Sequence, residues 1–200
     1  SYDPCYTYTV ERNVKIDFCA CIDELNNIHI VTISRKYELI YIVFDGTSWK
    51  RQVLYSHNNE LGIPNGPEIM VRDNYIYIIL SFIKLGNERK WSLWSYIRKN
   101  GIWSQKVLDK ASGLCYNQQS FNADSNGNIH LVYRCFDEHM RSVLKYNFLS
   151  KQKMEWDRTR VIFDNGVDKY KPYLFINKSD QIYIVWTELN CDFFLCCGMK

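Results

Sequence analysis

The chain of 200 residues carries 25 basic and 22 acidic side chains, and because these are scattered, its net charge of +3 gives no concentrated basic surface of the kind that nucleic-acid binding needs. With 46% hydrophobic residues, nine glycines and four prolines, the sequence is neither disordered nor low in complexity. Its length suits a single domain with a sizeable core.

The ends of the chain carry no recognisable signal for a cellular location. No apolar run approaches the ~18 residues of a membrane span, and the first residues lack a basic region followed by an apolar core, so no targeting signal is visible. Because the chain begins at Ser1 rather than Met, we expect a polypeptide that is processed or excised from a longer one. A secreted or cell-surface location is favoured.

The eight cysteines form no CxxC pair, the spacing typical of zinc and redox sites. Cys19 and Cys21 are two apart in an expected strand, which puts both sulfurs on one face. We interpret the cysteines mainly as small buried hydrophobic residues. Disulfides and metal binding are the alternatives.

One frame recurs four times along the chain: a strand end, a polar turn and a strand that starts with isoleucine. The anchor isoleucines are 48, 53 and 53 residues apart, and this period predicts a repeat architecture. The four copies are residues 22–31 with Ile28, residues 71–79 with Ile76, residues 122–133 with Ile129, and residues 176–185 with Ile182.

Each anchor strand is followed by a second strand, a polar turn, a tryptophan and a third strand. Asp45-Gly46 and Asn100-Gly101 favour the positive φ angles of tight hairpins, so the strands they join are expected to be antiparallel. No stretch of ten residues combines a 3.6 period with a capping signal, so almost no helix is expected. The repeated tryptophans, which we expect to be buried between units, are Trp49, Trp103 and Trp156, 54 and 53 residues apart.

The anchor strands are apolar at consecutive positions, as in residues 28–31 and 182–186, which implies burial on both faces. A β-propeller blade provides such burial. We therefore predict an all-β fold, a four-bladed β-propeller of four-stranded antiparallel blades in one domain, residues 1–200. The expected blades are about 14–56, about 67–110, about 118–164, and about 172–200 together with 5–11.

Closure of this ring depends on the N-terminus. Residues 6–10 alternate as a strand, and pairing them with residues 192–197 would supply the strand that the fourth blade lacks and remove the exposed edges. Cys5 would then lie near Cys196 or Cys197, within reach of a disulfide. A closed ring is expected to be a monomer.

Two segments resemble the repeats of sialidase-like and Asp-box β-propellers: residues 126–133 in an early strand, and residues 45–49 between later strands. The Asp-box turn has the form Ser-x-Asp-x-Gly-x-Thr-Trp. The first copy keeps Asp45, Gly46 and Trp49 with altered spacing, the second keeps only Gly and Trp, and the third lacks the Gly. In that family these turns are structural, so the resemblance implies the fold rather than an activity. The four-blade count is similar to the hemopexin-type ring, whose sequence signature this chain lacks.

No local motif supplies the several arginines, the Tyr nucleophile with its Glu partner and the Asp acid that a sialidase mechanism needs. Arg72, Arg134, Tyr133 and Glu188 lie near the ends of early strands, but charged residues are ordinary there. No catalytic residue is assigned, and an enzymatic role is not expected.

Polar residues repeat within the frame as well. Each copy has an aspartate in its first hairpin turn, where stabilisation of the turn is a sufficient reason. Each also has a His or Tyr between two apolar neighbours, which we expect to be hydrogen-bonded between blades. The residues are Asp23, Asp73, Asp124 and Asp180 in the turns, and His29, Tyr77, His130 and Tyr183 in the strands.

The repeat does not account for six further aromatic residues: Trp91, Trp94, Tyr96, Tyr170, Tyr173 and Trp186. Aromatic faces with nearby amides suit stacking on sugars or protein contacts, with packing between blades as the alternative. We therefore predict a non-catalytic binding module, without cofactor or metal, that recognises a glycan or a protein surface through loops at one mouth. The alternatives are a sialidase-like glycoside hydrolase and a structural piece of a larger assembly. The candidate ligand-binding residues are Trp91, Trp94, Tyr96, Tyr133, Arg134, Trp186 and Glu188.

Overall fold

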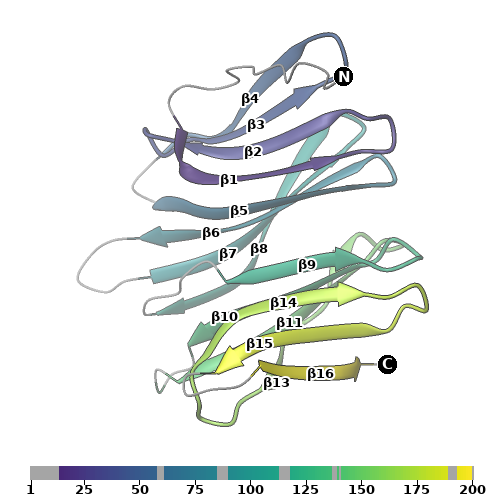
Figure 1. Ribbon diagram of the computed structural model, residues 1–200. Helices are drawn as coiled ribbons and strands as arrows, with labels where there is room; N and C mark the ends of the chain where they lie inside the picture. The colour runs from purple at the N-terminus through teal and green to yellow at the C-terminus, as the bar shows by residue number, and fades with distance from the viewer. Residues whose placement is uncertain are drawn as a thin grey trace, which may run out of the picture.

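A computed structural model describes residues 14–57, 61–84, 90–112, 118–136, 139, 141–188 and 193–199. Within these ranges the chain forms sixteen β-strands and no helix (Figure 1). The strands belong to four antiparallel sheets that follow one another along the chain. The all-β prediction is therefore confirmed.

The first two sheets each contain four strands in sequential order. Sheet 1 consists of β1 (Val14–Ile22), β2 (Ile28–Ser34), β3 (Leu39–Phe44) and β4 (Trp49–Tyr55). Sheet 2 consists of β5 (Ile63–Arg72), β6 (Tyr75–Lys84), β7 (Lys90–Lys99) and β8 (Ile102–Ser112).

The last two sheets depart from this pattern at their outer edge. In sheet 3 two short strands, β12 and β13, share the outer edge of β11, and sheet 4 has three strands in the described part of the chain. Sheet 3 consists of β9 (Gln119–Ala123), β10 (Ile129–Phe136), β11 (Ser142–Ser150), β12 (Glu155–Trp156) and β13 (Arg160–Phe163). Sheet 4 consists of β14 (Lys169–Ile176), β15 (Ile182–Glu188) and β16 (Phe193–Met199).

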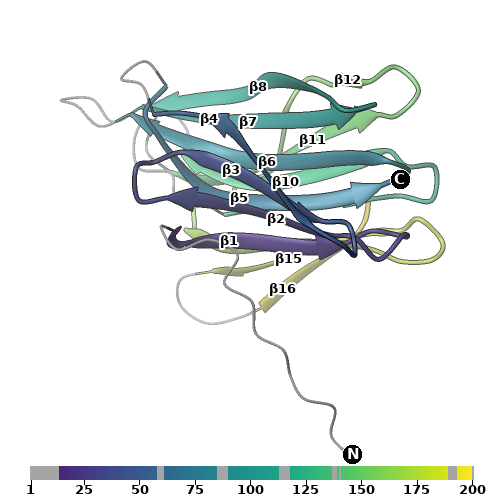
Figure 2. The same cartoon turned by 90° about the horizontal axis from the view of Figure 1, so that it is seen from above.

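The sheets stack face to face, with their strands running across the stack (Figure 2). In β6, Ile76 and Ile78 pack toward sheet 1, whereas Tyr77 and Ile79 pack toward sheet 3. Successive side chains of a strand point to opposite faces, so an unbroken apolar run buries both. We call the face toward the next sheet in the chain the forward face, and the face toward the preceding sheet the backward face.

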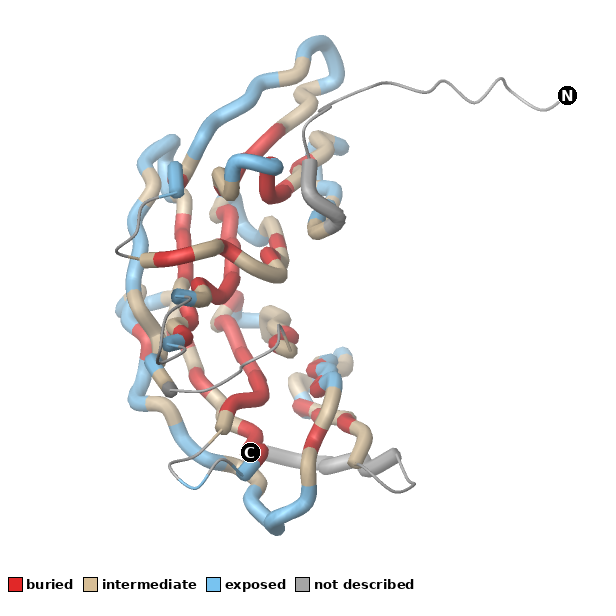
Figure 3. The backbone as a smooth tube through the Cα atoms, turned by 90° about the vertical axis from the view of Figure 1, so that its left-hand side faces the viewer, coloured by how far each residue is buried: buried red, intermediate tan, exposed pale blue. Residues whose placement is uncertain are grey.

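The stack bends into an arc, with β1, β5, β9 and β14 on its concave side and sheets 1 and 4 at opposite ends (Figures 1 and 3). A closed ring is not seen in the part of the chain that the structure describes. Residues 6–10, predicted to close it, and Cys5 lie outside the described residues. Cys19 and Cys21 are free thiols, half-buried against sheet 2.

The three repeated tryptophans pair with the residues that lie opposite the anchor isoleucines of their sheets, so their equivalence is confirmed for Trp49, Trp103 and Trp156. Trp156 is buried and its Nε1 donates a hydrogen bond to Ser95 Oγ of sheet 2, at 3.1 Å. The half-buried Trp103 donates to Gln52 Oε1 of sheet 1, at 3.0 Å. Each tryptophan of a later sheet thus bonds to the sheet before it, whereas the ring of Trp49 packs on Phe44 of its own sheet.

The repeated histidines bond within their own sheet, which corrects the expectation of bonds between blades. His29 Nδ1 lies 2.7 Å from Tyr41 Oη and its Nε2 lies 3.0 Å from Asp23 Oδ2. Sheet 3 repeats the arrangement with His130, Tyr146 and Asp124. The strand register places each His opposite the residue two positions from its Tyr, so both rings lie on one face of the sheet and the partners are local.

Replacing Trp156 by Ala should lower the free energy of unfolding by about 3–5 kcal/mol, because a buried indole and its bond to Ser95 are lost. Trp49→Ala is the matched control, and it should cost clearly less because Trp49 packs within its own sheet. Urea denaturation measures both variants. Equal losses would contradict a role for Trp156 in joining sheets 2 and 3.

Candidate functional site

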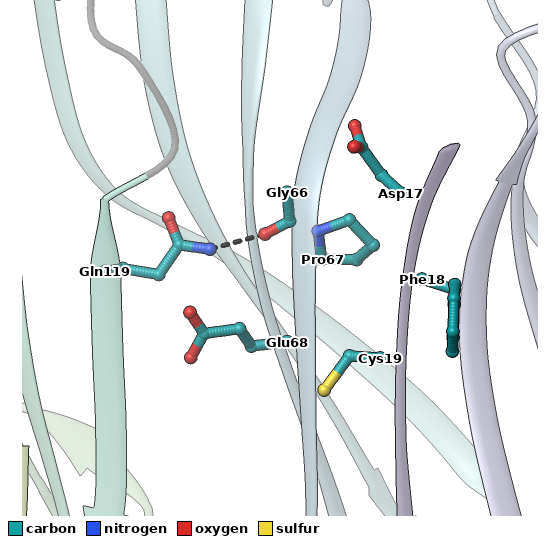
Figure 4. A pocket seen from close by; sticks show the side chains of 7 residues that line it. All are labelled: Asp17, Phe18, Cys19, Gly66, Pro67, Glu68 and Gln119. Atoms are coloured by element: carbon teal, nitrogen blue, oxygen red, sulfur yellow. Dashed lines mark hydrogen bonds between the residues drawn. The ribbon is translucent and has the colours of Figure 1, made fainter. Parts of the chain in front are cut away.

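A pocket of about 330 Å³ lies where the inner strands of the first three sheets come together. β1 contributes Asp17 and Cys19, β5 contributes Glu68, and β9 contributes Gln119. Figure 4 shows Glu68 and Gln119 pointing into the space between β5 and β9, with Cys19 reaching toward it from β1. The ring of Phe18, whose residue also borders the pocket, points away on the other side of β1.

An irregularity in β5 shapes the wall of this pocket. The register between β5 and β6 shifts between Asn65 and Glu68, so two residues, Gly66 and Pro67, are left out of the regular ladder. Gly66 has a φ of 54°, in the left-handed region that glycine adopts without strain. Pro67 has no backbone N–H to donate to a ladder, and such irregular positions suit it.

The Gly66 carbonyl is consequently available to sheet 3. Gln119 Nε2 donates a short hydrogen bond to this carbonyl oxygen, across the junction between sheets 2 and 3. The bond fixes the amide of a side chain that is only 7% exposed.

Glu68 lies on the face of β5 that packs against the following sheet, and its side chain is half-buried. Burial disfavours the charged carboxylate and raises the pKa of Glu68 to about 8. The carboxyl is therefore protonated at neutral pH and can donate a hydrogen bond. Burial also raises the pKa of the neighbouring Cys19 thiol, with a smaller contribution from Glu68.

The pocket thus combines a protonated carboxyl, a fixed amide and a second carboxyl, that of Asp17. Few, convergent polar groups in a concave site are typical of small-molecule binding. Within the described residues no group of three His, Cys, Asp or Glu side chains is placed to hold a metal ion. No helix among these residues is long and apolar enough to cross a membrane.

A second pocket, of about 530 Å³, opens at the other end of the sheets, between the β1–β2 and β5–β6 turns. His29 and Asp23 border it, and both are engaged with each other. Burial of Asp23 is outweighed by hydrogen bonds from Asn27 and His29, so the pKa of Asp23 is lowered to about 2. Since sheet 3 repeats the same bonds, we interpret this network as stabilisation of the turn.

The aspartates of the other turns differ in their roles. Asp124 repeats the bonds of Asp23 and accepts from Asn128. Asp73 accepts from Lys151 of sheet 3 at 2.7 Å, and Asp180 accepts from the Ser125 backbone of the same sheet at 2.8 Å. In both cases the turn aspartate joins two sheets rather than closing its own turn.

None of the ligand-binding residues predicted from the sequence borders the first pocket. Trp94 and Glu188 are half-buried, and Glu188 accepts from Asn165 Nδ2 at 3.0 Å and from the indole of Trp186 at 3.3 Å. The other five are at most 4% exposed: Trp91, Tyr96, Tyr133, Arg134 and Trp186. Their contact with a ligand stays a prediction.

Arg134 belongs to a cationic cluster between sheets 3 and 4. Its guanidinium lies 4.7 Å from the Phe136 ring centroid and 4.4 Å from that of Tyr170, and its Nε donates to Ser142 Oγ. Beside it, the fully buried Lys169 donates to three acceptors, the carbonyls of Ser142 and Val167 and the amide of Asn165. Burial lowers the pKa of Lys169. These saturated donors hold the two sheets together.

Sequence reasoning missed Glu68 and Asp17, whereas Gln119 is one of the amides that lie near the aromatic residues in the sequence. A signal was available, because Glu68 is the one carboxylate within the otherwise apolar segment 67–71 and Gln119 follows it by 51 residues, close to the repeat period. The repeat frame is defined by the anchor strands, whereas these residues belong to the inner strands that precede them.

Searches with the sequence find no matching family model and no matching curated protein. Among solved structures, a protein of unknown function from Dyadobacter fermentans is 11% identical with a TM-score of 0.64, over 86% of this chain and 62% of that one. The α-L-arabinanase of Penicillium chrysogenum, complexed with arabinobiose, is 9% identical with a TM-score of 0.66, over 90% and 59%. The NanB sialidase of Streptococcus pneumoniae is 14% identical with a TM-score of 0.53, over 84% and 26%.

At such identities the similarity concerns the fold alone. The chain has a β-propeller-like fold, built from blades of the kind found in these glycosidases, and spans about 60% of the length of the first two structures. The resemblance to sialidase-like propellers is thus supported for the fold.

The stability of the fold should depend on pH through Glu68. Between about pH 4.5 and 8 the unfolded chain releases the Glu68 proton while the folded chain keeps it, so the free energy of unfolding falls as pH rises. Glu68→Gln cannot ionise and should melt at a higher temperature relative to the parent chain at pH 8 than at pH 5. Differential scanning calorimetry measures this, with the exposed Glu155→Gln as control. A Glu68→Gln difference that is independent of pH would contradict the raised pKa.

Proposed function

We propose that the chain is a glycan-binding module without chemistry of its own, and that it holds sugar hydroxyls in the inner-strand pocket of Asp17, Cys19, Glu68 and Gln119. The observation that carries the proposal is the position of the half-buried Glu68 carboxyl beside a fixed amide on the concave side of the arc. The raised pKa of this carboxyl, about 8, favours its protonated form at neutral pH. The named activities of an arabinanase and a sialidase with similar folds give it further support.

The donors and acceptors of the pocket match those of a sugar. A hydroxyl both donates and accepts, so it can accept from the Glu68 carboxyl while donating to Asp17 or to Gln119 Oε1. The described residues that line the pocket include no lysine or arginine. This composition favours uncharged sugar hydroxyls over an anionic group.

Isothermal titration calorimetry with a panel of neutral oligosaccharides tests the proposal, and the parent chain should bind at least one of them. Glu68→Ala should weaken that binding about tenfold, the effect of losing one good hydrogen bond. Glu68→Gln keeps a neutral donor and should bind much more tightly than Glu68→Ala. The exposed Glu155→Ala is the matched control and should leave affinity unchanged.

The pH dependence of binding provides a second readout. Affinity should fall above about pH 8 in the parent chain, where Glu68 ionises, but not in Glu68→Gln. Failure of every oligosaccharide to bind would contradict the proposal. Release of product that stops in Glu68→Gln would instead support a glycoside hydrolase, because Asp17 and Glu68 place two carboxyls in one pocket.

A further inference from the structure

The three junctions of the stack are all built in the same way. At each one, the forward face of one sheet is buried against the backward face of the next. The arc therefore ends in two faces of opposite kind: the backward face of sheet 1 and the forward face of sheet 4. Neither meets another sheet in the part of the chain that the structure describes.

The backward face of sheet 1 exposes large apolar side chains along its inner strand. Phe18 is 69% exposed and Ile22 is 66% exposed. On β3 of the same face Ile40 and Ile42 are buried, and Val53 of β4, which pairs with Ile40, is 37% exposed. The most exposed apolar side chains of this face therefore lie along β1, and we call Phe18 and Ile22 the β1 strip.

Register identifies what this strip corresponds to elsewhere. Ile22 pairs with the anchor Ile28, as Val71, Ala123 and Ile176 pair with the anchors of their own sheets. Those three residues pack against the preceding sheet and are partly buried. Ile22 occupies the same position, and no sheet precedes it in the part of the chain that the structure describes.

The forward face of sheet 4 carries the complementary exposed surface. Tyr173 is 63% exposed and Phe175 is 38% exposed, and the Phe175 ring stacks on Tyr183 at 5.2 Å between centroids. We call Tyr173, Phe175 and Tyr183 the β14 strip.

By register, the β14 strip occupies the positions that form the forward half of each junction between two sheets. Phe175 corresponds to Cys21 and Met70, and both of these pack against the following sheet. The equivalents of Tyr173 are Cys19, Glu68 and Ser120, and all three are covered in part or in full. The two exposed strips therefore match as the two halves of the junctions already present in the stack.

We propose that a second copy of this chain covers these strips, with the β1 strip of one copy docked on the β14 strip of the other. Such a contact is heterologous, because each copy contributes a different surface. It continues the stack in the order that the three internal junctions set. It also removes from water the contiguous apolar surface that soluble domains rarely leave exposed.

Sedimentation velocity of the full chain over a range of concentrations tests the proposal. The parent chain should associate as concentration rises. Phe18→Asp and Tyr173→Asp should each weaken association by about tenfold or more, since a charge is placed in an apolar contact. Ile102→Asp, a similar change at an exposed residue outside both strips, is the matched control and should associate like the parent chain.

Mixing the two strip variants distinguishes this contact from a symmetric one. The Phe18→Asp copy keeps an intact β14 strip and the Tyr173→Asp copy keeps an intact β1 strip. An equimolar mixture should therefore form a heterodimer at concentrations where each variant alone is monomeric. Circular dichroism establishes that both variants are folded. A parent chain that stays monomeric at all concentrations would overturn the proposal, as would a mixture that behaves like the separate variants.

Discussion

The structure depends on burial of each sheet on both faces. A strand such as β6 is buried at seven successive positions, from Ile76 to Phe82, of which only Ser81 is a polar residue. Such a strand is stable only where neighbours exclude water on both sides. Stacking of consecutive sheets supplies that exclusion with short connections and antiparallel pairing throughout. The loops, the inner pocket and the exposed ends all take their positions from this stack.

The pocket results from an exception to the same rule. At a position where the other sheets place a thiol, a serine or a tyrosine, sheet 2 places Glu68, and the junction partly removes its carboxyl from water. Burial of a carboxyl without a cationic partner is unfavourable in the charged form, so the site retains the proton. The arrangement is a small local cost in stability at a position suited to ligand binding.

The sequence predicts the sheets well because their signal is local and repeated. Anchor isoleucines, Asp-Gly and Asn-Gly turns and tryptophans near the period of 53 residues are visible in one dimension. The candidate site was not predicted, because Asp17, Glu68 and Gln119 converge only when three sheets are stacked. The aromatic residues predicted to bind a ligand, such as Trp91 and Trp186, are instead buried at the junctions between sheets. Composition alone does not distinguish an aromatic ring that packs in the core from one that contacts a ligand.

The indole hydrogen bonds of Trp103 and Trp156 also bear on the order in which the sheets can assemble during synthesis. Each indole reaches a sheet that is nearer the N-terminus, so the acceptors for the tryptophans of sheets 2 and 3 are synthesised before those tryptophans. Assembly can then proceed one sheet at a time as the chain leaves the ribosome, and the longest-range contacts do not have to form before local ones. The same two bonds that anchor neighbouring sheets in the finished protein are thus compatible with assembly in chain order.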